Sequence, residues 1–207
     1  MADYLEKVDE NDHVELYVPS EVPNEIGVPR FDFQRGAVRH SNGFVVNAGC
    51  NEDAGGLKAM APERVINVDL HAFDEGMNRP NLVDKVFDIT KPEEWEREFA
   101  PNSVELVVFG DVLEHFGEEQ IKTALKCAHR IATRICITIP EDHRISDDAR
   151  YVDGIYNEHV TVATEELLRR VMSGMWKPFA WFSDVHWGFN DDQGKPVLGH
   201  CIEAHRI

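Results

Sequence analysis

The chain has 207 residues, 43% of them hydrophobic, which is enough for one domain with a sizeable core. Its net charge of −17 at pH 7 repels phosphate backbones and anionic membranes at long range, so duplex nucleic acid and a membrane surface are disfavoured as partners. No window is apolar enough to span a bilayer, and the acidic residues 1–23 contain no apolar segment of the kind that a secretory signal needs.

The cysteines are scattered along the chain, at positions 50, 127, 136 and 201, and none forms a CxxC pair. This pattern indicates neither a zinc site built on cysteines nor a disulfide framework. A reduced, cytoplasmic setting is therefore expected. The sequence carries no feature that indicates an oligomeric state.

Residues 1–40 are expected to form an irregular N-terminal leader that packs on the body through Phe31 and Phe33, since Pro19, Pro23 and Pro29 interrupt it. The domain proper would then be residues 41–207. Short apolar or β-branched runs predict seven strands, at 44–48, 64–69, 84–88, 104–109, 134–139, 179–186 and 197–205. The runs at 104–109 and 135–139 are mostly apolar and rich in β-branched residues, as in central strands that are buried on both faces.

Helices are predicted between these strands. Residues 118–132 place apolar side chains on one face at helical spacing, residues 164–176 begin with Thr164 as a cap, and a third helix begins near Lys91 with Thr90 as a candidate cap. Alternating strands and helices predict parallel βαβ units, and the last two strands, with no helix between them, predict an antiparallel hairpin. The fold class is therefore α/β, a three-layer sandwich around a seven-stranded, mostly parallel, Rossmann-like sheet whose last strand is antiparallel.

The loop after the first strand, "NAGCNEDAGG", is the expected ligand site, because ligands bind beyond the carboxyl ends of parallel strands. Gly49 follows that strand, and Asp69 ends the second strand at the spacing at which a carboxylate binds ribose hydroxyls. Asn51 and Glu52 stand where a dinucleotide site needs a close backbone approach, which disfavours a pyrophosphate and hence a nicotinamide-dependent oxidoreductase. S-adenosylmethionine, a cationic nucleoside without phosphate, suits the loop better, although a turn whose glycines serve only packing is an alternative.

Several segments together resemble the class I S-adenosylmethionine-dependent methyltransferases, especially the small members with a "VLEH" motif. "VVNAGCNED" is similar to their first motif, "NVDL" to the acidic end of the second strand, "VFDIT" to the adenine motif, and "VVFGDVLEHF" and "CITIPED" to the fourth and fifth strands; "NEHVTVATEELLRRV" resembles their segment with a His before a helix. The resemblance covers residues 44–176. It implies S-adenosylmethionine as cofactor and these cofactor-binding positions: Asn47, Gly49, Cys50, Asn51, Asp69, Leu70, Asp88, Ile89, Gly110 and Asp111.

Two departures from the first motif stand out. Asn47 replaces its usual acidic residue, and Asp53 stands where a third glycine is common. They motivate an alternative function, a non-catalytic protein that binds S-adenosylmethionine or S-adenosylhomocysteine.

The turn "DVLEH" after the fourth strand carries the candidate chemistry. If residues 111–115 form one helical turn, Asp111, Glu114 and His115 project to one side and, with His159, can hold a divalent cation such as Mg²⁺. This set resembles the metal site of small-RNA 3′-end 2′-O-methyltransferases and the turn of quinone-pathway O-methyltransferases. Without a metal, His115 or His159 is a candidate general base. Alternatively, the two carboxylates of the turn only begin a helix and the His115 imidazole packs under the sheet edge, with no part in catalysis.

The sequence thus predicts a methyltransferase that transfers a methyl group to an oxygen of a small molecule or a sugar. A metal-assisted RNA 2′-O-methyltransferase remains an alternative.

Overall fold

The computed structural model describes residues 29–50, 54–70, 83–142, 151–152, 155–156, 159–190 and 194–207. Its main sheet is built from seven strands, which are β1 (Val45–Ala48), β2 (Val65–Asp69), β3 (Lys85–Val86), β4 (Val104–Gly110), β5 (Ala132–Glu141), β8 (Trp176–Asn190) and β9 (Pro196–Arg206). A separate antiparallel pair joins β6 (Tyr151–Val152) to β7 (Ile155–Tyr156).

The strand order in the main sheet is β3-β2-β1-β4-β5-β9-β8. The neighbouring strands β3, β2, β1, β4 and β5 are mutually parallel, whereas β9 runs antiparallel to both β5 and β8. The predicted fold class is therefore confirmed, including the antiparallel hairpin of the last two strands. From β1 the chain builds the sheet outward to one side through β2 and β3, and then returns to the other side of β1 with β4. Open α/β sheets bind ligands at such a reversal of strand order.

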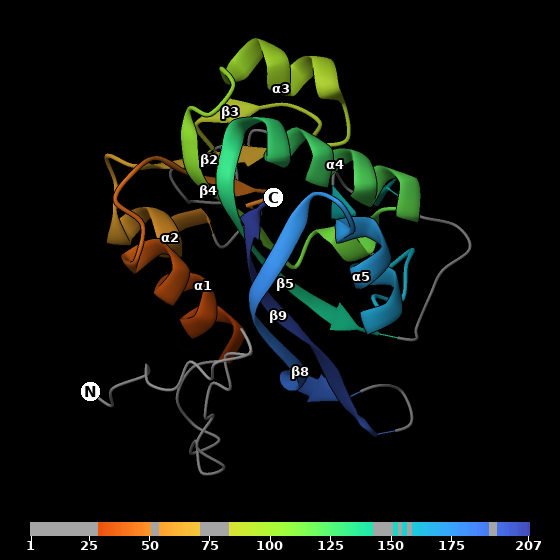
Figure 1. The fold of residues 1–207 in the computed structure, drawn as a ribbon. Helices are drawn as coiled ribbons and strands as arrows, with labels where there is room; N and C mark the ends of the chain where they lie inside the picture. Colours follow the sequence, from red (N-terminus) through yellow and green to blue (C-terminus); the bar gives the residue numbers. More distant parts are fainter. Residues whose placement is uncertain are drawn as a thin grey trace, which may run out of the picture.

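Helices cover both faces of the sheet (Figure 1). α1 (Pro29–Arg39) and α2 (Ala54–Met60) pack together on one face, and α3 (Pro92–Glu98), α4 (Glu118–Ile131) and α5 (Glu165–Met172) lie on the other. None of the helices in the described ranges is both long and apolar enough to cross a membrane.

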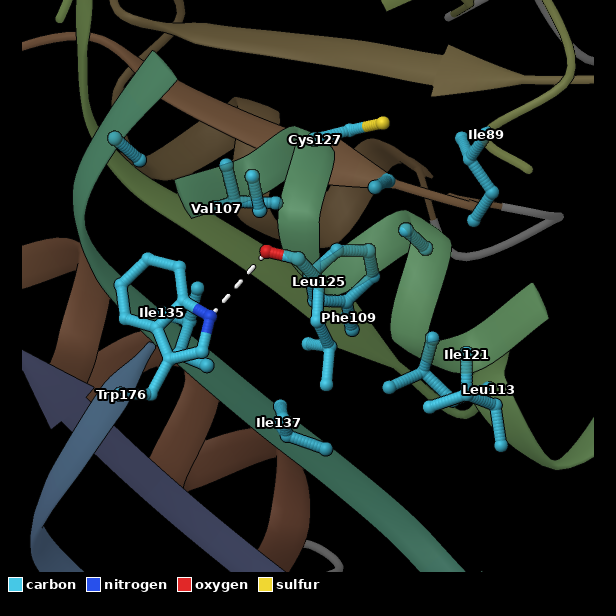
Figure 2. Close-up of a cluster of buried hydrophobic side chains, with 14 of the residues drawn as sticks. Ile89, Val107, Phe109, Leu113, Ile121, Leu125, Cys127, Ile135, Ile137 and Trp176 are labelled. Atoms are coloured by element: carbon cyan, nitrogen blue, oxygen red, sulfur yellow. Dashed lines mark hydrogen bonds between the residues drawn. The ribbon is translucent and has the colours of Figure 1, made fainter. Parts of the chain in front are cut away.

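Strand alternation divides the core between these faces. Ile135 and Ile137 of β5 belong to the cluster under α4 and α5, while Cys136 between them belongs to the cluster under α1 and α2. Figure 2 shows the first cluster, in which the Trp176 indole Nε1 donates to the Leu125 carbonyl oxygen at 3.3 Å. The indole N–H is thus buried together with the carbonyl oxygen that accepts its hydrogen bond.

The expectation that residues 1–40 are irregular is wrong for residues 29–39, which form α1. Pro29 begins the helix instead of interrupting it, because the first helical position needs no N–H donor. Ala37 and Val38 are buried against the sheet. Residues 1–28 lie outside the described residues, so their role as a leader stays a prediction.

Candidate functional site

A cavity of about 340 Å³ opens at the carboxyl ends of β1 and β4, at the reversal of strand order. Three parts of the chain form it. The strand ends and the loop after β1 contribute Asn47, Gly49, Cys50, Gly110 and Asp111; α2 contributes Gly56 and Leu57; and α1 contributes Arg30, Phe31, Gln34 and Arg35.

The backbone at Gly49 turns sharply as it leaves β1. Its φ is +71°, and a Cβ there would lie 2.2 Å from Val112 Cγ2. Both the left-handed backbone and the close approach require glycine. The first glycine of the loop therefore serves the turn and its packing against the segment that follows β4.

Five of the predicted cofactor-binding residues line the cavity, and a sixth lies beside it. The five are Asn47, Gly49, Cys50, Gly110 and Asp111. Asp69, at the end of β2, accepts a long hydrogen bond of 3.9 Å from Cys50 Sγ. Burial, and next the charge of Asp69, raise the pKa of the Cys50 thiol, so it stays protonated and acts as a donor. Asn51 lies outside the described residues.

The remaining three predicted residues, Leu70, Asp88 and Ile89, do not line this cavity. Asp88 Oδ1 accepts hydrogen bonds from the backbone N and the hydroxyl of Thr90, at 2.9 and 2.7 Å. The Ile89 side chain is buried in the core, and its carbonyl oxygen accepts from the Trp95 indole at 2.8 Å. Leu70 directly follows β2 and is half-buried. Their predicted contact with an adenosyl group stays a prediction.

Asp111 lies at the centre of a network that joins α1 to the sheet. Its Oδ2 is 2.8 Å from Arg30 Nε, and its Oδ1 accepts from the Thr138 hydroxyl at 3.2 Å. Thr138 in turn accepts from Gln34 Nε2 at 2.6 Å. Asp111 itself has a φ of +52°, which is uncommon for a residue with a side chain. The network holds this backbone in place.

The expectation of one helical turn over residues 111–115 is wrong at its beginning. The positive φ of Asp111 takes it out of helical geometry, and the short 3₁₀ turn η3 covers only Leu113–His115. The Asp111 carboxylate is paired with Arg30. Asp111 does not join the cluster of candidate metal ligands found among the described residues, which consists of Glu114, His115 and His159.

In this cluster the candidate ligand atoms lie within 4.8 Å of one another. The rings of His115 and His159 are 5.3 Å apart between centroids and meet edge to face. His159 reaches the turn because the backbone that follows it is tied there: the N–H groups of Val160 and Thr161 donate to the Glu114 carbonyl oxygen at 2.8 and 3.1 Å. His115 and His159, which are 44 positions apart in the sequence, are thus held close together.

Glu114 is buried, with only 2% of its surface exposed, and its Oε2 has no hydrogen-bond partner among the described residues. Burial raises the pKa of this carboxyl, the charges of Asp111 and Asp142 raise it further, and Arg30 opposes them. Asp142, also buried, lies 3.1 Å from His159 Nδ1 through its Oδ2. The cluster is therefore acidic and partly buried, and one of its carboxyl oxygens has no hydrogen-bond partner among the described residues.

Sequence reasoning missed Arg30, Gln34 and Arg35 as site residues, because α1 was read as irregular. The proline at the start of the helix and the acidic Asp32 in its first turn were the usable signs of a helix start. Asp142 was also missed, although an acidic residue at the carboxyl end of a parallel strand is a typical ligand position.

The sequence matches no protein-family model and no curated protein. Comparison with solved structures shows a known fold. The geranyl diphosphate C-methyltransferase of Streptomyces coelicolor A3(2), solved with Mg²⁺, geranyl diphosphate and S-adenosyl-L-homocysteine, is 14% identical; the match covers 85% of this chain and 77% of that one, with a TM-score of 0.56.

Two further solved structures have a similar fold. The 1,6-didemethyltoxoflavin-N1-methyltransferase of Burkholderia thailandensis is 18% identical, with 86% of this chain and 76% of that chain covered and a TM-score of 0.53. A protein of Pyrococcus horikoshii OT3, PH0226, is 13% identical, with 87% and 89% covered and a TM-score of 0.58. The chain therefore has the fold of class I methyltransferases. At these identities the likeness concerns the fold alone.

Proposed function

We propose that this protein transfers a methyl group from S-adenosylmethionine to an oxygen of a small molecule or a sugar. The observation that carries the proposal is the cavity of about 340 Å³ at the reversal of strand order in a class I methyltransferase fold, lined by the loop after β1 and the end of β4. Fold alone does not imply function, so the proposal depends on the residues at this cavity.

Those residues suit the cofactor. Asn47, Gly49 and Cys50 would line the methionine end, Asp69 would accept hydrogen bonds from the ribose, and Gly110 and Asp111 would lie beneath the sulfonium. Asn51, Leu70, Asp88 and Ile89 would complete the site toward the adenine. When bound, S-adenosylmethionine supplies an electrophilic methyl group. The protein's main task is then to align the acceptor with that methyl.

The acceptor hydroxyl also has to lose a proton. His159 and His115 do not line the cavity itself, and His159 would act as the base from the neighbouring turn. Asp142 Oδ2 lies 3.1 Å from Nδ1 of His159, so a proton on Nδ1 is held there and Nε2 is left with its lone pair. His115, whose ring contacts that of His159, is the second candidate. The Asp142 carboxylate beside Nδ1 of His159 would stabilise the imidazolium that forms.

A metal-assisted reaction, including RNA 2′-O-methylation, is the second candidate. The unpartnered Glu114 Oε2 within the Glu114, His115 and His159 cluster favours it. A divalent cation there would ease loss of the hydroxyl proton. Two imidazoles and one carboxylate suit Mn²⁺ or Zn²⁺ better than the predicted Mg²⁺, which prefers oxygen ligands. Asp111 is not part of this set, and its carboxylate is paired with Arg30.

Two measurements test the proposal. Titration calorimetry should show binding of S-adenosylhomocysteine and none of NAD. Radiolabelled S-adenosylmethionine incubated with panels of hydroxylated metabolites, sugars and RNA should then label an acceptor, and His159→Gln should lower kcat about 100-fold or more with a small change in cofactor affinity. Binding without transfer to any acceptor would support the non-catalytic alternative, and binding of NAD alone would refute the proposal.

Elemental analysis of the purified protein separates the metal-assisted reaction from the metal-free one. Stoichiometric Mn²⁺ or Zn²⁺ that is lost in Glu114→Gln, together with activity abolished by EDTA and restored by the metal, would support it. Full activity of metal-free protein would exclude it.

A further inference from the structure

Three polar side chains outside the cavity meet on adjacent strands of the main sheet. Ser183 belongs to β8, His200 to β9, and Glu141 ends β5. The His200 ring joins the other two, because its Nδ1 lies 3.2 Å from Ser183 Oγ and its Nε2 lies 3.2 Å from Glu141 Oε2. A hydroxyl, an imidazole and a carboxylate are thus hydrogen-bonded in one line across three neighbouring strands.

The partners of His200 determine which ring nitrogen carries the proton. An ionised carboxylate can only accept a hydrogen bond, so Glu141 holds the proton on Nε2. Nδ1 then keeps its lone pair and accepts from the Ser183 hydroxyl. His200 is buried, with 3% of its surface exposed, so bulk water has little access to the ring. A base that contacts a hydroxyl, and is itself oriented by a third group, is the arrangement that activates a serine as a nucleophile.

The backbone at Ser183 departs from the regular strand ladder. Between two regular pairs of β8 with β9, Ser183 and Asp184 both lie opposite His200, which is the pattern of a β-bulge. Asp184 has a φ of +57°, which is uncommon for a residue with a side chain. Bulges redirect side chains next to active sites, and strained backbone is concentrated at functional positions. The bulge therefore points to a role for Ser183 beyond the sheet itself.

The hydroxyl is accessible to a substrate. Ser183 is exposed, and the Glu141 side chain is 33% exposed, while His200 between them is buried. Trp181 lies two positions before Ser183, on the same face of β8, and its ring meets the His200 ring edge to face with centroids 6.1 Å apart. An indole beside a nucleophile can contact an apolar acyl group. The surface therefore suits a small ester.

We propose that Ser183 is the nucleophile of a further active site, which hydrolyses carboxylic esters with His200 as the base. Ser183 Oγ forms a bond to the ester carbonyl carbon while its proton passes to His200 Nδ1. The bond from that carbon to the alcohol oxygen then breaks, and the alcohol leaves with the proton. Water attacks the acyl-serine with the same base, which releases the carboxylic acid and returns the proton to Ser183.

Glu141 acts through His200 as a positioning residue. It holds the ring in one tautomer and stabilises the imidazolium that forms when His200 takes the serine proton. The reaction does not involve S-adenosylmethionine, so it stands or falls separately from the proposed function.

Covalent labelling tests the nucleophile directly. A fluorophosphonate reacts with a serine that a neighbouring base activates, so the intact protein should gain the mass of one phosphonyl group, and peptide mapping should place it on Ser183. Ser183→Ala should abolish the label. Ser103→Ala is the matched control and should leave it unchanged, because Ser103 is also exposed but its hydroxyl donates to the Ala100 carbonyl oxygen at 2.7 Å.

Release of p-nitrophenol from p-nitrophenyl butyrate measures turnover. His200→Gln should lower the labelling rate and kcat about 100-fold or more. Glu141→Gln should lower kcat about tenfold or more and change KM less than about threefold, as expected of a group that acts through the base. Thermal unfolding checks that each variant is folded, and Glu141→Gln, at a partly exposed position, remains decisive if His200→Gln does not fold.

Several results would overturn the proposal. These are an unaltered protein that neither reacts with the fluorophosphonate nor releases p-nitrophenol, a label on another residue, and turnover that survives in Ser183→Ala. Labelling of Ser183 without turnover would overturn the hydrolysis. An unchanged kcat in Glu141→Gln would overturn the role of the carboxylate.

Discussion

The contact between Gly110 and Gln34 gives a quantitative test of how α1 is docked over the cavity. A Cβ at Gly110 would lie 2.6 Å from Gln34 Nε2 and 3.1 Å from its Cδ. Gly110→Ala therefore forces the Gln34 amide off Thr138, to which it donates at 2.6 Å in a buried place. Overpacking of this kind costs about 1–3 kcal/mol of unfolding free energy.

Gln34→Ala alone should also cost about 1–3 kcal/mol, since it leaves the Thr138 hydroxyl without its buried donor. In that background the added methyl of Gly110→Ala no longer meets the amide group of residue 34. The double variant should therefore be less destabilised than the sum of the single ones by about 1–2 kcal/mol, well above the roughly 0.5 kcal/mol expected of independent sites.

Urea unfolding followed by tryptophan fluorescence measures all four free energies. The m-values should agree between the variants, so that differences in midpoint report stability. Strict additivity would refute the reasoning, because it would mean that Gln34 does not lie over Gly110 and that α1 is not held against the end of β4.

Three further predictions concern single positions. Glu114→Gln should raise stability at pH 7 and should lose that advantage as the pH falls, because burial raises the folded-state pKa of Glu114 and folding therefore becomes less favourable as the pH rises above the unfolded-state pKa. Melting curves from pH 4 to 8 test this, and a constant difference between the proteins would contradict it. Gly199→Ala should lower stability by about 1–3 kcal/mol in urea unfolding, since its Cβ would lie 2.5 Å from both the Ile139 carbonyl oxygen and a Trp187 ring carbon; an unchanged midpoint would show that the strands can part there. Thr164→Ala should cost about 1 kcal/mol and Thr164→Ser far less, because the hydroxyl accepts from the third N–H of α5; equal losses would mean that the cap contributes nothing.

The sheet was predictable because its pattern is local. Apart from Glu105, the run Val104–Gly110 is apolar and rich in β-branched residues, and most of it is buried, so its composition identifies a central strand. Thr164 caps α5 as predicted, since a hydroxyl before a run of good helix formers satisfies an N–H wherever it occurs. The antiparallel direction of β9 was predictable because the sequence has no helix pattern between the last two strands.

The site was less predictable because its contacts are not local. α1 contains Gly36 and alternates charged with apolar residues, and its place is decided by packing on the sheet and by the pair between Arg30 and Asp111. The Asp111 carboxylate also does not join the candidate metal ligands, although the sequence predicted it there. Distances between residues more than 80 positions apart cannot be obtained from spacing within one motif.

The insertion of β9 between β5 and β8 has a consequence for how the protein is made. Until residues 196–206 leave the ribosome, β5 presents an open edge and β8 has no strand to pair with in the main sheet. Such edges invite pairing with other nascent chains. A chain stalled near residue 190 would therefore be a substrate for chaperones, although its first five strands could already be assembled.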